Sequence, residues 1–320
     1  MATQQTPINS GFGPRTTALE VVEGLNLCGK TAIVTGGYSG LGLESTQALV
    51  SAGARVIVTA RRLIAAHEAL HLVDGIEICE LDLSNLDSVR QFAETVVGSG
   101  RHIDFVINNA GIMACPETRV GPKWEAQFAT NHLGHYALIN LLWPALVDGA
   151  RVVTVSSAAH HFSPIRWDDV QFENGYDKWL AYGQSKTANA LFTIHLDTIG
   201  RSQGIRAFTL HPGSIITPLQ RHIPKEEMIA LGWMDEAGNP ADPSMLKTPP
   251  QGAATQLWAA LSPQLKDMGG LYCEDCDIAN IASAEINTLA GVREHAIDPE
   301  QAQRLWTLSA SLTGINAFKA

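Results

Sequence analysis

The chain has 320 residues, of which 45% are hydrophobic and 17% charged, and its formal net charge is −10. This length and apolar content predict one large α/β domain or two small ones with a sizeable core, and argue against a disordered chain. The acidic balance argues against nucleic acid and anionic membranes as partners, because both attract clustered Lys and Arg. No apolar run is long enough for a membrane span or a secretion signal. Five sparse cysteines fit a reducing compartment, so the cytoplasm is the expected location.

The predicted elements begin with an N-terminal extension over residues 1–25, flexible up to about residue 15 and followed by a short helix over 16–24. Short apolar runs then alternate with helical patterns. Strands are expected at residues 31–36, 54–60, 75–83, 102–111, 151–157 and 205–213, and the helices include a long one over 122–147 and another over about 182–203. Such alternation indicates parallel strands joined by crossover helices. We therefore predict an α/β fold in residues 26–320: a single doubly wound parallel sheet of Rossmann type with helices on both faces.

Two stretches, residues 158–181 and 214–250, interrupt this alternation with prolines and polar residues. Long loops in a compact fold tend to be functional, so we predict that both form walls or a lid over a substrate site. Trp233 and Met234 in the second stretch suit an apolar ligand, although packing within the loop explains them equally.

A glycine-rich turn follows the first predicted strand, with the sequence TGGYSGLG over residues 35–42. Glycine permits a positive φ and a close backbone approach, and the N-terminus of the following helix favours a pyrophosphate. A tight turn without a ligand is the plainer interpretation, but this position in a βαβ unit favours a dinucleotide. The candidate cofactor residues here are Gly36, Tyr38, Ser39, Gly40 and Leu41.

The ends of the next strands extend this site. The second strand ends at Arg61 with no acidic residue, whereas NAD-preferring sites usually carry Asp or Glu there. Arg61 is suited to a 2′-phosphate, the alternative being a solvated cation at a helix start, so we predict NADP(H) rather than NAD(H). Asp82 and Leu83 follow the third strand, and Asn109, Ala110 and Gly111 follow the fourth. Asp82 is equally suited to accept from an adenine amino group or to cap a turn.

Tyr182 and Lys186 lie four residues apart and share a helix face, and Ser157 lies at the end of the fifth strand. A free tyrosine has a pKa of about 10, and a nearby ammonium group together with an oxidised nicotinamide would lower that pKa. Ser157 is able to hydrogen-bond a substrate oxygen. A Tyr-x-x-x-Lys spacing alone usually marks a solvated helix face, but the order of motifs before it favours catalysis.

The segments TGGYSGLG, NNAG, VSS, YGQSK and HPG, in that order, resemble the short-chain dehydrogenase/reductase family over about residues 25–280. TTALEVVEGLNLCGKTAIVTGG, NHLGHYAL and SSAAHHF look like the branch of the retinol dehydrogenases and the WW-domain-containing oxidoreductase. We find neither a WW domain nor a membrane anchor, so the substrates and locations of those relatives do not carry over.

The resemblance implies an oxidoreductase without a metal, acting on a carbonyl or alcohol carbon of an apolar ketone, aldehyde or secondary alcohol. Tyr182 would be the general acid/base, Lys186 would lower its pKa, and both would contact the cofactor. Ser157 would orient the substrate oxygen. Asn131 would support a proton relay, although on its own it reads equally well as a packing residue. The segment that contacts the cofactor carboxamide would include Pro212, Gly213, Ile215 and Thr217.

Four further points stay open in the sequence. Family members usually pair through their two long helices, which predicts a homodimer or homotetramer, although some relatives are monomers. A catalytically silent dinucleotide-binding regulatory protein is the main alternative, and a nucleotide-sugar epimerase fits poorly because too little chain follows Gly213. His160 and His161 either line the substrate mouth or are satisfied inside the fold. The lone Cys273-x-x-Cys276 pair reads as the end of a strand rather than a zinc or redox site.

Overall fold

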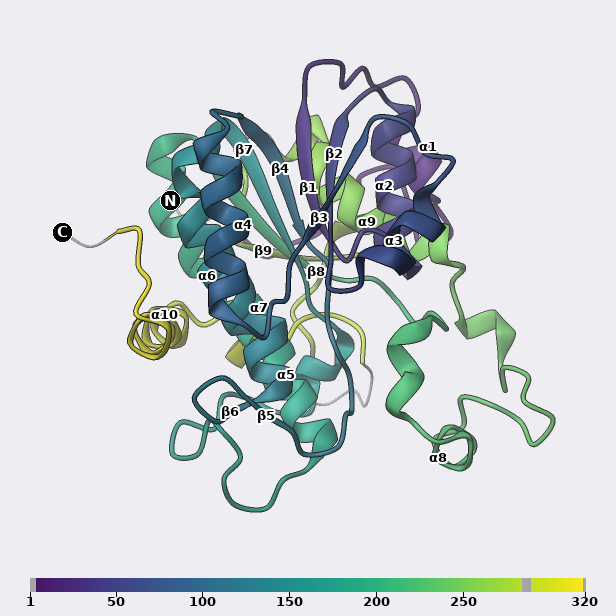
Figure 1. Ribbon diagram of the computed structural model, residues 1–320. Helices are drawn as coiled ribbons and strands as arrows, with labels where there is room; N and C mark the ends of the chain where they lie inside the picture. The colour runs from purple at the N-terminus through teal and green to yellow at the C-terminus, as the bar shows by residue number, and fades with distance from the viewer. Residues whose placement is uncertain (1–3, 284–288, 319–320) are drawn as a thin grey trace.

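Figure 1 shows the computed structural model, which describes residues 4–283 and 289–318. Eight strands form one sheet in the order β10-β9-β8-β7-β4-β1-β2-β3. Neighbouring strands run parallel, except that β10 is antiparallel to β9. The chain builds outward from β1 through β2 and β3, then crosses to β4 and continues the other way. This reversal confirms the predicted doubly wound sheet and leaves a crevice position between β1 and β4.

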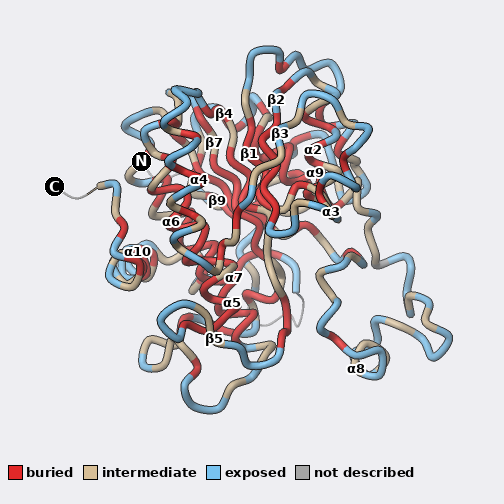
Figure 2. The backbone as a smooth tube through the Cα atoms, in the orientation of Figure 1, coloured by how far each residue is buried: buried red, intermediate tan, exposed pale blue. Residues whose placement is uncertain are grey.

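The strands are short and mostly buried, as Figure 2 shows for the centre of the sheet. Their bounds are β1 Thr31–Thr35, β2 Arg55–Ala60, β3 Ile76–Glu80, β4 Ile103–Asn108, β7 Leu146–Val155, β8 Arg206–His211, β9 Leu271–Glu274 and β10 Asp277–Ile278. The six predicted strands are therefore present. The largest differences in extent are in three of them: the third ends at Glu80, which leaves Asp82 and Leu83 in the following loop, the fourth ends at Asn108, and the fifth begins at Leu146.

Helices cover both faces of the sheet, as predicted. Alternate residues of each strand face opposite layers, so that Ala32 and Val34 pack on one side and Ile33 on the other. The first side holds α1 Ala18–Val22, α2 Gly40–Ser51, α3 Leu63–Leu70 and α9 Pro249–Leu261. The second side holds α4 Leu86–Gly98, α6 Gly134–Leu142 and α7 Lys178–Gly200, with α10 Pro299–Thr313 outside them.

The long helix predicted over residues 122–147 is wrong at both ends. A hairpin of β5 Arg119–Val120 and β6 Trp124–Glu125 comes first, and the Glu125 carboxylate then caps α5 Ala126–Phe128 by accepting from two backbone N–H groups. A π-helical turn over Ala129–Leu133 leads into α6, which ends at Leu142. A 3-10 turn over Trp143–Ala145 follows, where Pro144 lacks the N–H that a continuing α-helix would need. The helix predicted from residue 182 begins earlier, at Lys178, where Asp177 caps it.

The N-terminal extension is packed rather than flexible over its described part. The Gln5 amide donates to the backbone oxygens of Tyr272 and Ala279, both at 2.7 Å, and the Asp277 carboxylate accepts from the backbone N–H groups of Ile8 and Ser10. The predicted helix is confirmed as α1, with Thr17 and Glu20 in a capping box. The extension therefore covers the β9–β10 edge of the sheet, which sequence patterns did not indicate.

The second predicted loop, which we call the lid, contains short helices, including η5 Pro218–His222, α8 Lys225–Ala230 and η6 Pro243–Met245. It extends away from the sheet at the lower right of Figure 1. Its two ends nevertheless meet, because the Lys247 N–H donates to the Ser214 carbonyl at 2.9 Å. No helix among the described residues is both long and apolar enough to cross a bilayer.

The C-terminal helix α10 covers the outer face of α6 and α7. His132, Tyr136 and Asn140 form one stripe along the π turn and α6, and all three hydrogen-bond to α10 or to the chain just after it. The Trp306 ring stacks on Phe192 of α7, with the ring centroids 5.9 Å apart. The helices through which we expected two copies to pair are thus covered by the chain itself, and the predicted pairing surface is not free.

Candidate functional site

The turn between β1 and α2 can be formed only with glycine at particular positions. Gly36 has a φ of +65°, a conformation that side chains rarely adopt. A Cβ atom on Gly42 would lie 2.5 Å from the Gly36 carbonyl oxygen and 2.6 Å from the Asn109 amide nitrogen. Ser39 begins α2 without a side-chain cap, so the first N–H groups of the helix face the turn with no side-chain acceptor.

The segment after β4 is tied to this turn. The Asn109 side chain donates to the Thr35 carbonyl at 2.8 Å, and the backbone N–H groups of Asn109 and Ala110 both donate to the Thr35 hydroxyl at 2.9 Å. Asp82 lies in the loop after β3 and stabilises the turn that it begins, because its Oδ1 accepts from the Ser84 N–H and hydroxyl. Asp82 thus caps a turn through Oδ1, while its predicted contact with an adenine amino group stays a prediction, and Leu83 beside it is buried.

The start of the lid returns to the same turn. Gly213 has a φ of +98° and lies against the Lys247 side chain, which pairs with Asp275. A Cβ on Gly40 would lie 3.5 Å from the Thr217 side chain, and one on Gly252 would touch both Leu41 and Ile215. The predicted carboxamide-contacting segment and the glycine-rich turn are thus neighbours.

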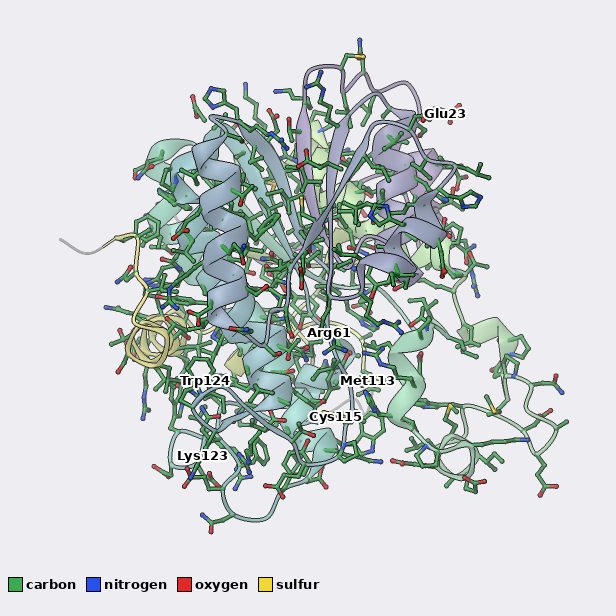
Figure 3. The ribbon with its side chains drawn as sticks, in the orientation of Figure 1. Glu23, Arg61, Met113, Cys115, Lys123 and Trp124 are labelled. Atoms are coloured by element: carbon green, nitrogen blue, oxygen red, sulfur yellow. The ribbon has the colours of Figure 1, made fainter. Side chains whose placement is uncertain are left out.

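Arginines gather beside the turn without counter-ions. Arg61 and Arg62 are exposed at the end of β2, and Figure 3 shows Arg61 beside the region of Met113 and Cys115. Burial lowers the pKa of Arg221, and the positive charges of Arg61 and Arg62 lower it further. None of these three arginines forms an ion pair with a described carboxylate. Sequence reasoning missed Arg221, since only the folded lid brings it to Arg61.

The four predicted catalytic side chains come together at the N-terminal half of α7. Tyr182 is 3% exposed and hydrogen-bonds with Ser157. The Lys186 ammonium nitrogen donates to the Val155 carbonyl at 2.9 Å and lies 5.6 Å from the centre of the Tyr182 ring. Asn131 and Lys186 approach each other across Gly111, where an added Cβ would lie 3.1 Å from Asn131 Oδ1 and 3.7 Å from Lys186 Nζ.

Burial is the main influence on the pKa values of Tyr182 and Lys186. Burial raises the pKa of Tyr182 to about 12, against a smaller lowering by the Ser157 hydrogen bond, and burial lowers the pKa of Lys186 to about 7, because loss of water disfavours both charged forms. The predicted lowering of the Tyr182 pKa by Lys186 together with an oxidised nicotinamide stays a prediction. Tyr182 is held as a neutral phenol, which is the form that donates a proton.

Apolar side chains from both predicted loops surround Tyr182. Met113, Ala159 and Ile223 are buried against it, and Trp179, Leu219 and Met228 pack around them half-buried. The lid is fastened there by Glu227, which pairs with Lys178 and accepts from the Trp179 indole at 3.0 Å. The Trp233 ring packs edge-on against Trp179. The two stretches thus form one apolar enclosure over the tyrosine.

The two histidines after Ser157, His160 and His161, form their hydrogen bonds with groups of the protein itself. His160 is fully buried, with Nδ1 donating to the Ser157 carbonyl and Nε2 accepting from the Arg293 N–H. His161 binds the Gly291 carbonyl and the Arg293 side chain. Cys273 and Cys276 are buried at the end of β9, and the described residues contain no group of three or more His, Cys, Asp or Glu that could hold a metal ion.

Buried neutral histidines predict a loss of stability in mild acid. Burial lowers the pKa of His132 and His160 to about 3 and of His135 and His211 to about 4, from the ordinary 6.5. Between about pH 6.5 and pH 4 the unfolded chain binds more protons than the folded one, so stability falls as pH falls. Each such histidine costs about 1.4 kcal/mol per pH unit in this window.

We expect the urea midpoint to be clearly lower at pH 5.5 than at pH 7.5. His132→Gln, which removes one of these titrating groups, should show a smaller drop between the two conditions. An unchanged midpoint for the parent protein at both pH values would contradict this interpretation.

Comparison with known proteins agrees with this geometry. The pattern of the short chain dehydrogenase family matches residues 30–228. A probable oxidoreductase of Streptomyces antibioticus is 44% identical over 292 residues, which cover 88% of this chain and 97% of that protein. A solved structure of an uncharacterized protein from Mycobacterium paratuberculosis superposes with a TM-score of 0.72 at 33% identity, covering 94% of this chain and 98% of the other. The chain belongs to the short chain dehydrogenase family of oxidoreductases.

Its place within that family is also defined. Retinol dehydrogenase 11 of Homo sapiens is 34% identical over 299 residues, covering 91% of this chain and 88% of that protein. The chain is therefore a member near the retinol dehydrogenase branch, as the NHLGHYAL segment had indicated.

Proposed function

We propose that this protein is an NADP(H)-dependent oxidoreductase acting on the carbonyl or alcohol carbon of an apolar ketone, aldehyde or secondary alcohol, that is, on CH–OH donors in the oxidative direction. The observation that carries this proposal is the buried group of Tyr182, Ser157 and Lys186 inside an apolar enclosure, connected to the glycine-rich turn through the Asn109–Gly111 segment. Apolar walls suit an apolar substrate, because polar groups on a substrate would lose their hydrogen bonds to water there.

The residues present fit a nicotinamide dinucleotide. Gly36 and Gly42 leave a cradle that a Cβ would fill, and the uncompensated arginines offer charge for a phosphate. The dinucleotide supplies the hydride acceptor or donor. The residues that would hold it are Gly36, Tyr38, Ser39, Gly40, Leu41, Arg61, Asp82, Leu83, Asn109, Ala110, Gly111, Tyr182, Lys186, Pro212, Gly213, Ile215 and Thr217.

The chain's own groups handle the proton. In reduction, the neutral Tyr182 hydroxyl donates its proton to the oxygen of the substrate carbonyl as negative charge develops there. Ser157 holds that oxygen by a second hydrogen bond and so fixes the carbonyl relative to the tyrosine. Lys186 lies behind the tyrosine ring and, when protonated, stabilises the phenolate left after the transfer. Asn131, beside Lys186, supports the route by which the proton is replaced.

The choice of NADP(H) rests on the arginines, and it gives a direct prediction. Arg61→Asp should lower kcat/KM for NADPH by about ten- to hundredfold, because a charge-assisted hydrogen bond contributes about 1.5–3 kcal/mol. The same variant should use NADH at least as well as the parent protein. Arg221→Ala should act in the same direction on NADPH. Arg55→Asp, at the exposed far end of the same strand, is the matched control.

Equal use of NADPH and NADH by the parent protein would contradict this assignment. So would an Arg61→Asp variant whose cofactor preference matches that of Arg55→Asp.

Small molecules are the expected partners, and the five free cysteines keep the cytoplasm as the proposed location. The homodimer or homotetramer predicted from the family would use the face that α10 covers. We propose that copies of this chain do not pair through α6 and α7, since α10 already supplies the apolar and polar contacts of that face.

The test of the proposed reaction is turnover with NADPH against a panel of aldehydes and ketones of increasing apolar size, followed by NADPH absorbance. Oxidation of NADPH that depends on the apolar substrates is the expected result. NADPH binding without turnover on any member of the panel would favour the catalytically silent, dinucleotide-binding alternative.

A further inference from the structure

The helix that carries Asn131 contains a second buried polar residue, His135, one turn later and on the same side. His135 is 1% exposed, and neither ring nitrogen reaches water. Its neighbour along the helix, His132, is buried equally but faces α10, where its Nε2 meets the Ser309 hydroxyl at 2.7 Å. The two histidines therefore serve two different faces of the same helix.

Hydrogen-bond partners fix the tautomer of His135. Its Nδ1 lies 2.9 Å from the Asn131 carbonyl oxygen, which can only accept, so Nδ1 carries the proton. Its Nε2 lies 3.0 Å from the Thr35 hydroxyl. That hydroxyl already accepts from two backbone N–H groups, of Asn109 and Ala110. Its own proton has two acceptors within reach, the Ile107 carbonyl at 3.4 Å and the closer, unprotonated Nε2, which it favours. Both ring nitrogens are thus used, and the imidazole is neutral.

The chain of hydrogen bonds continues from Asn131 into the catalytic helix. The Asn131 amide accepts from the Ile112 N–H and donates to the Ile112 carbonyl, both at 2.9 Å. The same amide nitrogen donates to the Ser185 hydroxyl at 2.9 Å, and Ser185 donates to the Tyr182 carbonyl at 2.8 Å. Thr35 and the His135 ring therefore link the segment after β4 to the backbone of Asn131, and the side chain of Asn131 continues the link through Ser185 to the Tyr182 carbonyl.

The local backbone explains why the path passes through this helix. The π turn over Ala129–Leu133 widens the helix at Asn131, and such turns are concentrated at functional sites. Gly134 lets the helix approach the loop after β3, because a Cβ there would lie 2.2 Å from the Leu83 carbonyl oxygen. Each side chain of the NHLGH segment from Asn131 to His135 therefore has a contact outside its own helix or, for the glycine, a required close approach; Leu133 packs in the apolar cluster with Leu191 and Leu305.

We propose that His135 is a positioning residue that couples the glycine-rich turn to Asn131 and Tyr182. It holds Thr35, and with it the N–H groups of Asn109 and Ala110, in register with the helix that carries Asn131. Linked hydrogen bonds in a buried site polarise and rigidify one another, so loss of the central member loosens both ends. The expected effect of this coupling on catalysis rests on the proposed function, whereas its expected effect on the structure does not.

The test compares three variants of His135 with matched variants of His132. His135→Phe removes both hydrogen bonds. His135→Asn keeps a donor for the carbonyl four residues earlier, a bond that Asn140 makes to the Tyr136 carbonyl at 2.8 Å in the same helix. His135→Gln reaches toward Thr35 but leaves the Asn131 carbonyl without its donor. His132→Phe and His132→Asn disturb the α10 face alone.

The first readout needs no activity. Amide hydrogen exchange in the peptide containing Asn109 and Ala110 should accelerate in His135→Phe and His135→Asn, and stay unchanged in the His132 variants. The second readout is kcat at saturating NADPH, which should fall about ten- to hundredfold in His135→Phe, as expected when reacting groups are misplaced by about 1 Å. The two single-bond variants should fall between the parent and His135→Phe. A double variant with Ser185→Ala should be non-additive in kcat.

Equal exchange rates and equal kcat in His135→Asn and the parent protein would overturn the proposal, as would identical effects of the His132 and His135 substitutions. Absence of turnover in the parent protein would instead count against the proposed function, while the exchange measurement would still decide the structural link.

Discussion

Replacing Tyr182 by phenylalanine is expected to lower kcat by about a thousandfold, within the 10²–10⁴ range that a positioned proton donor contributes. The substitution removes one hydroxyl from a fully enclosed ring and leaves the packing with Met113 and Ile223 in place. NADPH affinity should therefore stay within about twofold of the parent value, since most of the predicted cofactor contacts come from other residues. Steady-state kinetics and a separate NADPH titration measure the two quantities.

Tyr176→Phe is the matched control for this experiment. Tyr176 lies in the loop just before α7 and is half-buried, with its hydroxyl donating to the Cys115 carbonyl at 2.9 Å. It makes no contact with Ser157 or Lys186, so its loss should lower stability without a large change in kcat. A Tyr182→Phe variant that keeps more than a tenth of the parent turnover would exclude Tyr182 as the proton donor.

Trp306→Ala is expected to lower the free energy of unfolding by about 3–5 kcal/mol, as large-to-small substitutions of buried aromatic residues do. Trp306 is 6% exposed, stacks on Phe192 and meets Tyr136 edge-on with ring centroids 4.8 Å apart. Urea unfolding followed by circular dichroism measures the change. Gln303→Ala, on the exposed side of the same helix, should have an effect below about 0.5 kcal/mol.

We expect the same helix, α10, to control whether copies of the chain associate. The parent protein should behave as a monomer of 34.4 kDa in light scattering, because α10 occupies the face on α6 and α7. Trp306→Ala loosens that cover and should raise the tendency to self-associate. A stable parent dimer whose contacts map to residues of α6 and α7 would show that α10 moves aside, and would restore the pairing expected from the family.

The sequence predicted features whose cause is local. The glycines of the turn, the four-residue spacing of Tyr182 and Lys186, and the apolar strands each follow from backbone geometry within a few residues, and the fold and family are confirmed. Arg221 and His135 escaped prediction because their partners are distant in sequence: Arg221 meets Arg61 only through the folded lid, and His135 meets Thr35 a hundred residues earlier.

Errors in the predicted elements have equally physical causes. The apolar pattern over 122–147 does not reveal that Glu125 caps a helix start or that a π turn interrupts it. The prediction for the Tyr182 pKa considered Lys186 and an oxidised nicotinamide but not burial, which is the largest influence on that pKa in the folded chain. Burial depends on the lid, whose conformation no pattern in residues 214–250 specifies.

The joined ends of the lid have an evolutionary consequence. Since the Ser214 carbonyl and the Lys247 N–H hold each other, the thirty or so residues between them form a cassette whose two ends meet, and Glu227 attaches its middle to Lys178 and Trp179. Doubling the length of such a segment costs only about 0.6 kcal/mol of closure entropy. Substitutions and insertions inside the cassette can therefore change which molecules reach Tyr182 during evolution, while the catalytic residues beneath it stay the same.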